Sequence, residues 1–391
     1  MSAISAATAA ASDRDSTNRA VALWLFVCCA MIFAMVVIGG ITRLTWSGLS
    51  ITEWQPVTGI VPPLSAADWQ AEFAKYQQTS QYKLLNTGIG LADFKAIFLW
   101  EYVHRLWGRL IGFVYLLPFL YFLARGRIPR RLTWPLAGIF ALGFAQGALG
   151  WWMVKSGLAN RIEVSQYRLT AHLALALVIY AATLWTALGL LRNQSFLSAS
   201  GGGEGRGEVG DSRGARAFPP HPPSAPRWAP PSPPDERRWI LIRRGADIVL
   251  CLVSLTIVAG GFVAGLNAGL TYNTFPLMDG RFVPAGYAQL SPFWRNWFEN
   301  VPAVQFDHRL LAITTVTAVV ALWLSAWRFA VPPRARRALH ALLAVALLQV
   351  SLGISTLLLV VPVPLAAAHQ AGAVLLLTAA IVLRHRLRET A

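Results

Sequence analysis

Long apolar segments without charged residues recur along the chain, and they constrain its fold more than any other feature. A helix needs about 20 apolar residues to cross the hydrocarbon core of a bilayer. Seven segments without Asp, Glu, Lys or Arg have about this length: residues 21–41, 132–154, 169–191, 248–268, 310–327, 338–361 and 363–383. An eighth, residues 96–123, is long enough but carries Glu101, His104, Arg105 and Arg109 in its first half. The sequence therefore predicts an all-α integral membrane protein with eight transmembrane helices.

The basic residues predict how these helices are oriented. The chain carries 34 Lys and Arg against 18 Asp and Glu, a net charge of +16. With both termini in the cytoplasm, most Lys and Arg fall in the tails and the inner connections, as the positive-inside rule requires. We therefore interpret the basic surplus as a topology signal with contact to anionic lipid, and we expect no nucleic-acid partner.

The N-terminal residues bear on the compartment. The first apolar segment is too long for the core of a secretory signal peptide, so we expect it to remain as a helix. The residues before it include Asp13 and Asp15, which are unlike a mitochondrial transit peptide. These features favour a multi-pass protein of the bacterial inner (plasma) membrane.

A stretch rich in Gly, Pro and Ser, residues 199–236, divides the chain in two. It has no periodic apolar pattern and too little apolar surface to fold, which is typical of a disordered linker. The predicted organisation is a cytoplasmic tail (1–20), an N-terminal four-helix half (21–191), a disordered cytoplasmic linker (192–244), a C-terminal four-helix half (245–384) and a second cytoplasmic tail (385–391).

The two halves share motifs in the same order, which indicates an internal duplication. The matched motifs are Gly39-Gly40 with Gly260-Gly261, Gly48-Leu49-Ser50 with Gly269-Leu270-Thr271, His104-Arg105 with His308-Arg309, Gln146-x-x-x-Gly150 with Gln349-x-x-x-Gly353, and His172 with His369. Because four helices per half is an even number, both halves have the same orientation in the membrane. The predicted architecture is two parallel four-helix bundles related by a pseudo-two-fold axis along the membrane normal.

Four histidines lie in the apolar segments at a similar depth, toward the outer leaflet: His104, His172, His308 and His369. A single histidine in such a helix is more often an interhelical hydrogen-bonding group than a ligand. Two histidines on facing helices of a four-helix bundle, however, are the arrangement that holds heme iron through two axial imidazoles. One such pair in each half favours two bis-histidine heme sites, with all four residues as iron ligands.

Residues next to these histidines leave two interpretations open. Arg105 and Arg309 could bind heme propionates, or they could extend toward the lipid headgroups. Small residues one turn after the histidines, such as Gly108 and Gly372, leave room for a macrocycle but also favour close helix packing.

Glu101 distinguishes the two halves. Glu101-x-x-His104 places a carboxylate on the same helical face as the histidine, whereas the second half has Gln305 at the matching position. Glu101 could perform acid/base or charge-stabilising chemistry beside a heme, or it could pair with Arg105 or Arg168. The asymmetry predicts an active first half and a supporting second half.

Taken together, these motifs resemble the heme A synthase family over nearly the whole chain apart from the N-terminal tail and the linker. The resemblance is carried by Gly39-Gly40-Ile41-Thr42-Arg43, Glu101-x-x-His104-Arg105, Gln146-x-x-x-Gly150-Trp151-Trp152, Tyr272-Asn273-Thr274-Phe275-Pro276 and Asp307-His308-Arg309. The chain lacks the cysteine pair that some members carry in the outer loops, so it is similar to the proteobacterial and mitochondrial branch.

The resemblance implies an enzyme that oxidises a ring methyl of heme O to a formyl group, giving heme A for terminal oxidases. It implies that His104 and His172 flank the iron of the substrate heme O, with Glu101 as the catalytic carboxylate. It also implies that His308 and His369 ligate a heme b cofactor. Expected partners are heme O and its synthase, an electron-transfer partner and the lipid bilayer; a second copy of the chain is left open.

Two other functions compete with this one. From the residues alone, a bis-histidine membrane cytochrome b that transfers electrons ranks above an enzyme, and the family resemblance reverses that order. The second is a transporter with parallel repeats, whose outer-leaflet histidines would bind a substrate or metal. The sequence, however, has no pair of helices broken by Gly or Pro at mid-membrane, as such sites often have.

Overall fold

The computed structural model describes residues 2–55, 58–160, 162–200, 233–328 and 331–388. Within these ranges the chain is helical, with no β-strand. The eight long helices are α1 (Ser2–Leu44), α4 (Leu91–Ala124), α5 (Arg130–Asn160), α6 (Gln166–Ser200), α7 (Pro233–Gly265), α9 (Val301–Trp327), α10 (Pro333–Leu358) and α11 (Val363–Arg386). Each contains a segment long and apolar enough to cross a membrane. The prediction of an all-α protein with eight spanning helices, including the charged segment 96–123, is confirmed.

Several helices extend beyond their apolar segments. α6 continues to Ser200 and α7 begins at Pro233, so both enter the range 192–244 that we expected to be a linker without structure. α1 begins at Ser2 and includes the expected N-terminal tail, which is rich in alanine. Adding a residue to an existing helix costs far less than starting one, so a spanning helix extends into neighbouring polar residues. Residues 201–232 lie outside the described residues, and the division into domains stays a prediction.

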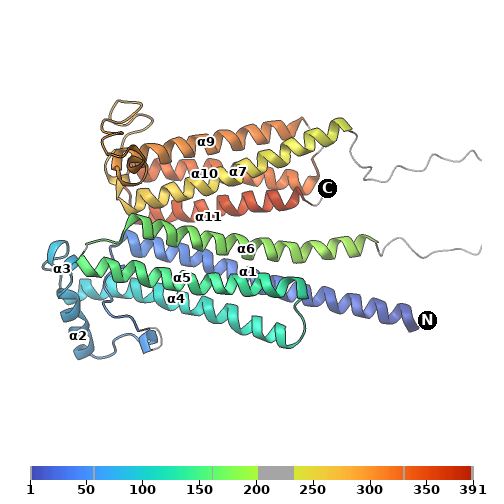
Figure 1. The fold of residues 1–391 in the computed structure, drawn as a ribbon, viewed down its shortest axis with the longest axis horizontal. Coiled ribbons are helices and arrows are strands. Elements are labelled where there is room, and N and C mark those ends of the chain that lie inside the picture. Colours follow the sequence, from blue (N-terminus) through green and yellow to red (C-terminus); the bar gives the residue numbers. More distant parts are fainter. Residues whose placement is uncertain (1, 56–57, 161, 201–232, 329–330, 389–391) are drawn as a thin grey trace, which may run out of the picture.

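The neighbours of each helix follow the order of the chain. In the first half α1 contacts α4 and α6, and α5 lies between α4 and α6; in the second half α7 contacts α9 and α11, and α10 lies between α9 and α11. The halves meet where α6 contacts α7 and α11, and where α1 contacts α11. Figure 1 shows the two sets of helices side by side with their axes roughly aligned. If a pseudo-two-fold axis relates the halves, α1 matches α7 and α6 matches α11, so the contact between α1 and α11 is the counterpart of the contact between α6 and α7. That axis stays a prediction.

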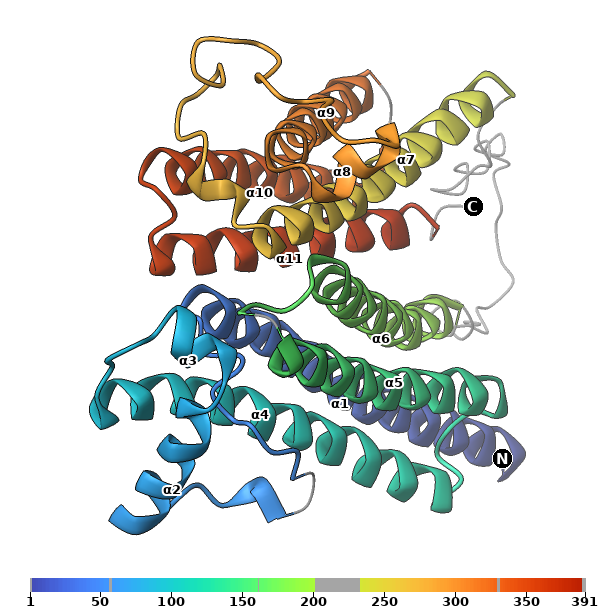
Figure 2. The ribbon, with the colours of Figure 1, turned by 60° about the vertical axis from the view of Figure 1, so that its left-hand side comes forward.

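Short elements at one end of the helices form a cap over each half (Figure 2). The first-half cap contains η1 (Thr58–Ile60), α2 (Ala66–Gln77) and α3 (Ser80–Leu84), and the second-half cap contains η2 (Ala268–Leu270), η3 (Phe293–Arg295) and α8 (Asn296–Glu299). In the first cap, Tyr76 of α2 packs on Phe94 and Phe98 of α4 in a buried aromatic cluster. This cluster attaches the cap to the helix that carries Glu101.

A partly buried ionic cluster joins the halves near the caps. A terminal nitrogen of Arg43, at the end of α1, donates to Glu163 Oε2 at 3.0 Å and to Asn267 Oδ1 at 2.9 Å. It also donates to the carbonyl of Ala264 at the end of α7, at 3.0 Å. Asn267 Nδ2 in turn donates to both oxygens of Glu163. Arg43 and Glu163 come from the first half and Asn267 from the second, so the cluster holds the ends of α1 and α7 that face the caps together.

We expect Arg43→Ala to lower the free energy of unfolding by about 1–3 kcal/mol, because it removes hydrogen bonds to a partly buried carboxylate. The measurement is the midpoint of thermal unfolding in detergent. Lys83→Ala, at an exposed position, is the control. A double-mutant cycle with Glu163→Gln isolates the interaction of the pair. Additive effects of the two substitutions would show that the ion pair does not hold the halves together.

Further contacts between the halves reach from the caps into the membrane. The hydroxyl of Tyr167 on α6 donates to Glu299 of α8 at 2.8 Å, and Arg295 donates to the same carboxylate. The hydrogen bonds from Arg295 and Tyr167 hold the pKa of Glu299 below its usual range. Deeper in the membrane, the hydroxyls of Tyr180 on α6 and Thr378 on α11 are 2.8 Å apart. Polar contacts of this kind hold helices together in lipid, where apolar surfaces gain little by associating.

Candidate functional site

The four predicted histidines occupy matching places in the two halves. His104 lies on α4 and His172 on α6, while His308 lies on α9 and His369 on α11. His104 and His172 are close enough to interact electrostatically, and so are His308 and His369. All four side chains are partly buried. The fold therefore brings the histidines together as one pair in each half.

The ring nitrogens of these histidines suit an axial ligand. The Nδ1 atoms of His104, His172 and His369 are fully buried and have no hydrogen-bond partner among the described residues. In His308, Nδ1 is 3.1 Å from the carbonyl oxygen of Thr256. In three of the four rings a buried nitrogen is thus left without a partner in the described part of the protein. A pair of imidazoles with ring nitrogens free to bind a metal fits a heme, because the heme itself supplies the four equatorial ligands of the iron.

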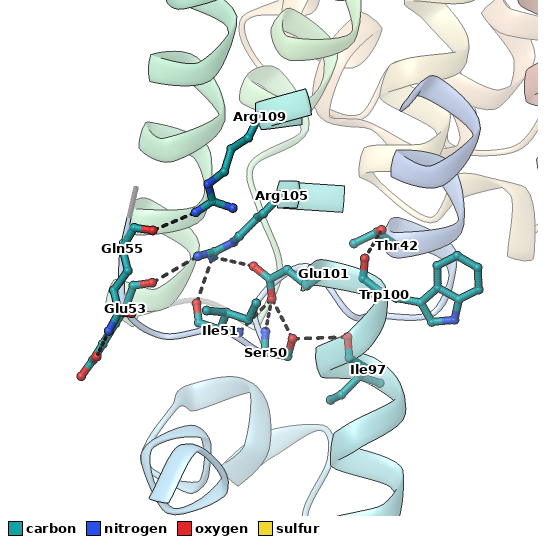
Figure 3. Close-up of polar contacts among 10 residues, drawn as sticks. All are labelled: Thr42, Ser50, Ile51, Glu53, Gln55, Ile97, Trp100, Glu101, Arg105 and Arg109. Carbon is teal, nitrogen blue, oxygen red and sulfur yellow. Dashed lines mark hydrogen bonds and ion pairs between the residues drawn. The ribbon is translucent and has the colours of Figure 1, made fainter. Parts of the chain in front are cut away.

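Glu101 is a buried carboxylate of the first half (3% exposed). Its Oε2 accepts hydrogen bonds from the backbone N–H of Ser50 at 2.7 Å, the hydroxyl of Ser50 at 2.7 Å and the N–H of Ile51 at 2.8 Å. Its Oε1 accepts from Arg105 at 2.6 Å. Figure 3 shows the carboxylate between Arg105 and the loop that contains Ser50 and Ile51. A carboxylate with four donors is held in a single position.

The arginines beside the histidines hold the loops at the cap end of the helices. Arg105 donates to the carbonyls of Ile51 and Glu53 at 3.0 and 3.1 Å, besides pairing with Glu101. Arg309 repeats this arrangement in the second half, donating to the carbonyls of Tyr272 and Thr274 at 2.6 and 2.8 Å. The contact of Arg105 and Arg309 with heme propionates stays a prediction. The alternative partner for Glu101, Arg168, lies over the ring of Trp152 instead, at 4.1 Å.

The second half has the same framework without the carboxylate. Gln305, which matches Glu101, is buried and donates through Nε2 to the carbonyl of Tyr272 at 3.2 Å. Its Oε1 is buried and finds no donor among the described residues. Gln305 has no ionisable group at this place, whereas Glu101 can accept a proton and carry a negative charge. The two halves thus have similar contacts at this position but differ in whether the side chain can ionise.

Two of the small residues near the histidines make room for other side chains rather than for a macrocycle. A methyl group added at Gly108 would lie 3.2 Å from the terminal methyl of Met35, and one added at Gly372 would lie 2.2 Å from Oε1 of Gln349. Helix packing, the alternative interpretation of these positions, accounts for both. Sequence reasoning also missed the role of Ser50 and Ile51, although the repeat of Gly48-Leu49-Ser50 in the second half was a signal.

The fold and the paired histidines define a class, a multi-pass membrane protein with two histidine pairs suited to heme iron. A family model described as cytochrome oxidase assembly protein (COX15-CtaA) matches residues 22–381, and the chain belongs to this family.

Curated relatives cover nearly the whole chain. The chain is 50% identical to "Heme A synthase" of Nitrosospira multiformis over 376 residues, 96% of this chain and 96% of that protein. It is 47% identical to "Heme A synthase" of Rhodospirillum centenum, covering 99% of this chain and 94% of the relative. It is also 43% identical to "Heme A synthase COX15" of Homo sapiens, covering 95% of this chain and 84% of the relative.

Proposed function

We propose that this protein is a heme A synthase, an oxidoreductase that converts a ring methyl of heme O to the formyl group of heme A for terminal oxidases. The observation that carries the proposal is identity of 43–50% to proteins of that name over nearly the full chain. The paired histidines and the buried Glu101 support it, because this reaction needs a heme site with an acid/base group beside it.

The substrate heme O would be held in the first half by His104 and His172, and a heme b cofactor would be held in the second half by His308 and His369. The difference between Glu101 and Gln305 supports this assignment. When bound, the hemes supply the redox chemistry and the electron transfer. The chain supplies the axial ligands, the site between the helices and the acid/base group.

Glu101 lies about one helical turn before His104 on the same face of α4. Oxidation of the methyl group to an alcohol, and then to a hydrated aldehyde that loses water, replaces a C–H bond with a C–O bond in each of the two steps. Each step removes two electrons from the carbon, which pass to an external oxidant, and requires proton transfer near the ring. A carboxylate held by Ser50, Ile51 and Arg105 can accept such a proton or stabilise positive charge beside the ring. Because its other contacts are loop N–H and O–H groups, Glu101 also connects the site with the cap on the outer side.

We also propose that the chain resides in a bacterial plasma membrane with both termini in the cytoplasm and the heme sites toward the outer leaflet. The basic residues of the inner connections support this orientation. In this setting the partners are the bilayer, heme O with the synthase that makes it, and an electron-transfer protein.

The test is the heme content of the purified protein after co-expression with a heme O source. Hemes extracted with acid acetone are separated by chromatography and identified by mass. We expect heme b together with heme O, a hydroxylated intermediate or heme A. Heme b alone, at two per chain despite available heme O, would favour the electron-transfer cytochrome instead, and a protein without heme would exclude both functions.

A further inference from the structure

Each of the four histidine rings lies against a glycine of a neighbouring helix. A methyl group added at Gly39 would lie 2.9 Å from Cε1 of His104, and one at Gly150 would lie 2.9 Å from Cε1 of His172. In the second half, a methyl group at Gly260 would lie 3.1 Å from Cε1 of His308, and one at Gly353 would lie 2.9 Å from Cε1 of His369. Close contact between ring and glycine thus occurs at all four histidines.

The glycines come from the four spanning helices that carry no member of the histidine pairs: α1, α5, α7 and α10. Distances of 2.9–3.1 Å are shorter than the contacts that side-chain methyl groups normally make, so any larger residue there would displace the ring. Other glycines of the spanning helices vary. A methyl group added at Gly138 on α5, or at Gly112 on α4, would meet nothing within 4 Å, whereas one added at Gly245 would lie 2.9 Å from Leu322 and one at Gly265 would lie 2.6 Å from Gln166. The feature that the four glycines beside the histidines share is therefore the neighbour, because in each case the side chain that a larger residue would meet is the ring of a paired histidine.

A glutamine one turn before two of the glycines holds the backbone of the same histidine. Gln146 Nε2 donates to the carbonyl oxygen of His172 at 2.9 Å, and Gln349 Nε2 donates to that of His369 at 3.0 Å. Residues four apart share one face of a helix. The repeated Gln-x-x-x-Gly motif therefore contacts its histidine twice, with the glutamine at the backbone and the glycine at the ring.

We propose that these residues are positioning residues for the axial imidazoles. Gly39, Gly150, Gly260 and Gly353 let each ring lie close to a neighbouring helix and so set its rotation and its depth in the bundle, while Gln146 and Gln349 set the height of α6 and α11 against α5 and α10. This inference rests on the proposed function, in which the four histidines bind heme iron. A displaced ring no longer directs its nitrogen at the iron, so the bond to the iron weakens. Partners of metal ligands typically change metal affinity about 10- to 100-fold.

The first test is Gly353→Ala in the full-length holoprotein, with Gly138→Ala as the matched control. Alanine is the better helix former, so both changes favour the helix and differ in whether a histidine ring is in the way. The measurements are the rate of heme transfer to apomyoglobin and the electron paramagnetic resonance g values of the low-spin heme, which respond to the orientation of the axial ligand rings. We expect about 10- to 100-fold faster loss of one heme and shifted g values for Gly353→Ala, and neither change for Gly138→Ala.

The second test is Gln349→Leu, which removes the hydrogen bond to His369 without adding volume beside the ring. We expect faster heme loss with a similar thermal unfolding midpoint, and this variant carries the test if Gly353→Ala does not accumulate. Wild-type rates and g values in both Gly353→Ala and Gln349→Leu would overturn the inference and leave the proposed function intact. A wild-type protein that contains no heme would overturn both.

Discussion

Replacement of Glu101 by glutamine is expected to reduce heme A formation by about 10²- to 10⁴-fold, the usual contribution of a positioned acid/base group. Bound heme should remain, because His104 and His172 are unchanged. The protein already contains a glutamine in this setting, since Gln305 occupies the matching place in the second half and bonds the carbonyl of Tyr272. Glu101→Gln therefore removes the ionisable group with little change in volume. The measurement is the ratio of heme A to heme O and hydroxylated heme in acid-acetone extracts.

The controls separate this role from a structural one. Glu101→Ala would also lose activity, but it leaves the buried N–H groups of Ser50 and Ile51 and the guanidinium of Arg105 without their acceptor, which destabilises the loop. Glu53→Gln changes an exposed carboxylate of the same loop and should keep normal output. Normal heme A production by Glu101→Gln would refute a catalytic role for this carboxylate.

Replacement of His369 by alanine is expected to remove about half of the bound heme and, with it, all detectable heme A formation. The reason is that a bis-histidine heme loses an axial ligand, and the first half then has no electron relay. His104→Ala should have a different effect: heme b remains while heme O is no longer converted. The measurements are heme per chain by the pyridine hemochromogen spectrum and heme identity by mass.

The control for the histidine variants is His340→Ala. His340 accepts a hydrogen bond from Trp323 at 2.9 Å, and it lies near the start of α10, far along the helix from Gly353. Its loss should leave heme content unchanged. If His369→Ala retained full heme content and an unchanged low-spin spectrum, the assignment of His369 as an iron ligand would be wrong.

Sequence reasoning predicted the helices and the chemistry-bearing residues because both depend on local information. Eight segments can cross a bilayer by length and composition, and in lipid a helix satisfies its own backbone hydrogen bonds. The histidines stood out because an ionisable or ligating side chain in such a segment is costly without a function. The ends of the helices were less predictable, as α7 shows, because helices extend past the apolar core into polar residues.

The contacts around these residues could not be predicted in the same way. Glu101 was left between catalysis and pairing with either of two arginines, and the structure provides Arg105, Ser50 and Ile51 as its partners. Gly372 was left between space for a macrocycle and close helix packing, and the side chain of Gln349 lies where a larger residue at this position would extend. In each case the residue that makes the contact lies on another helix or loop. Its identity could not be predicted because several side chains compete for the same space.

The sequence by itself determined that this chain is an eight-helix membrane protein with four histidines and a glutamate in its apolar segments, because hydrophobic length, charge and ligand type are properties of the residues themselves. Only the tertiary structure decided what each of these groups touches. Ser50 and Glu101 are 51 residues apart, and His172 meets Gln146 and Gly150 across a helix interface. The packing of neighbouring helices fixes such distances to a fraction of an ångström, and a pattern along one helix carries no information about that packing.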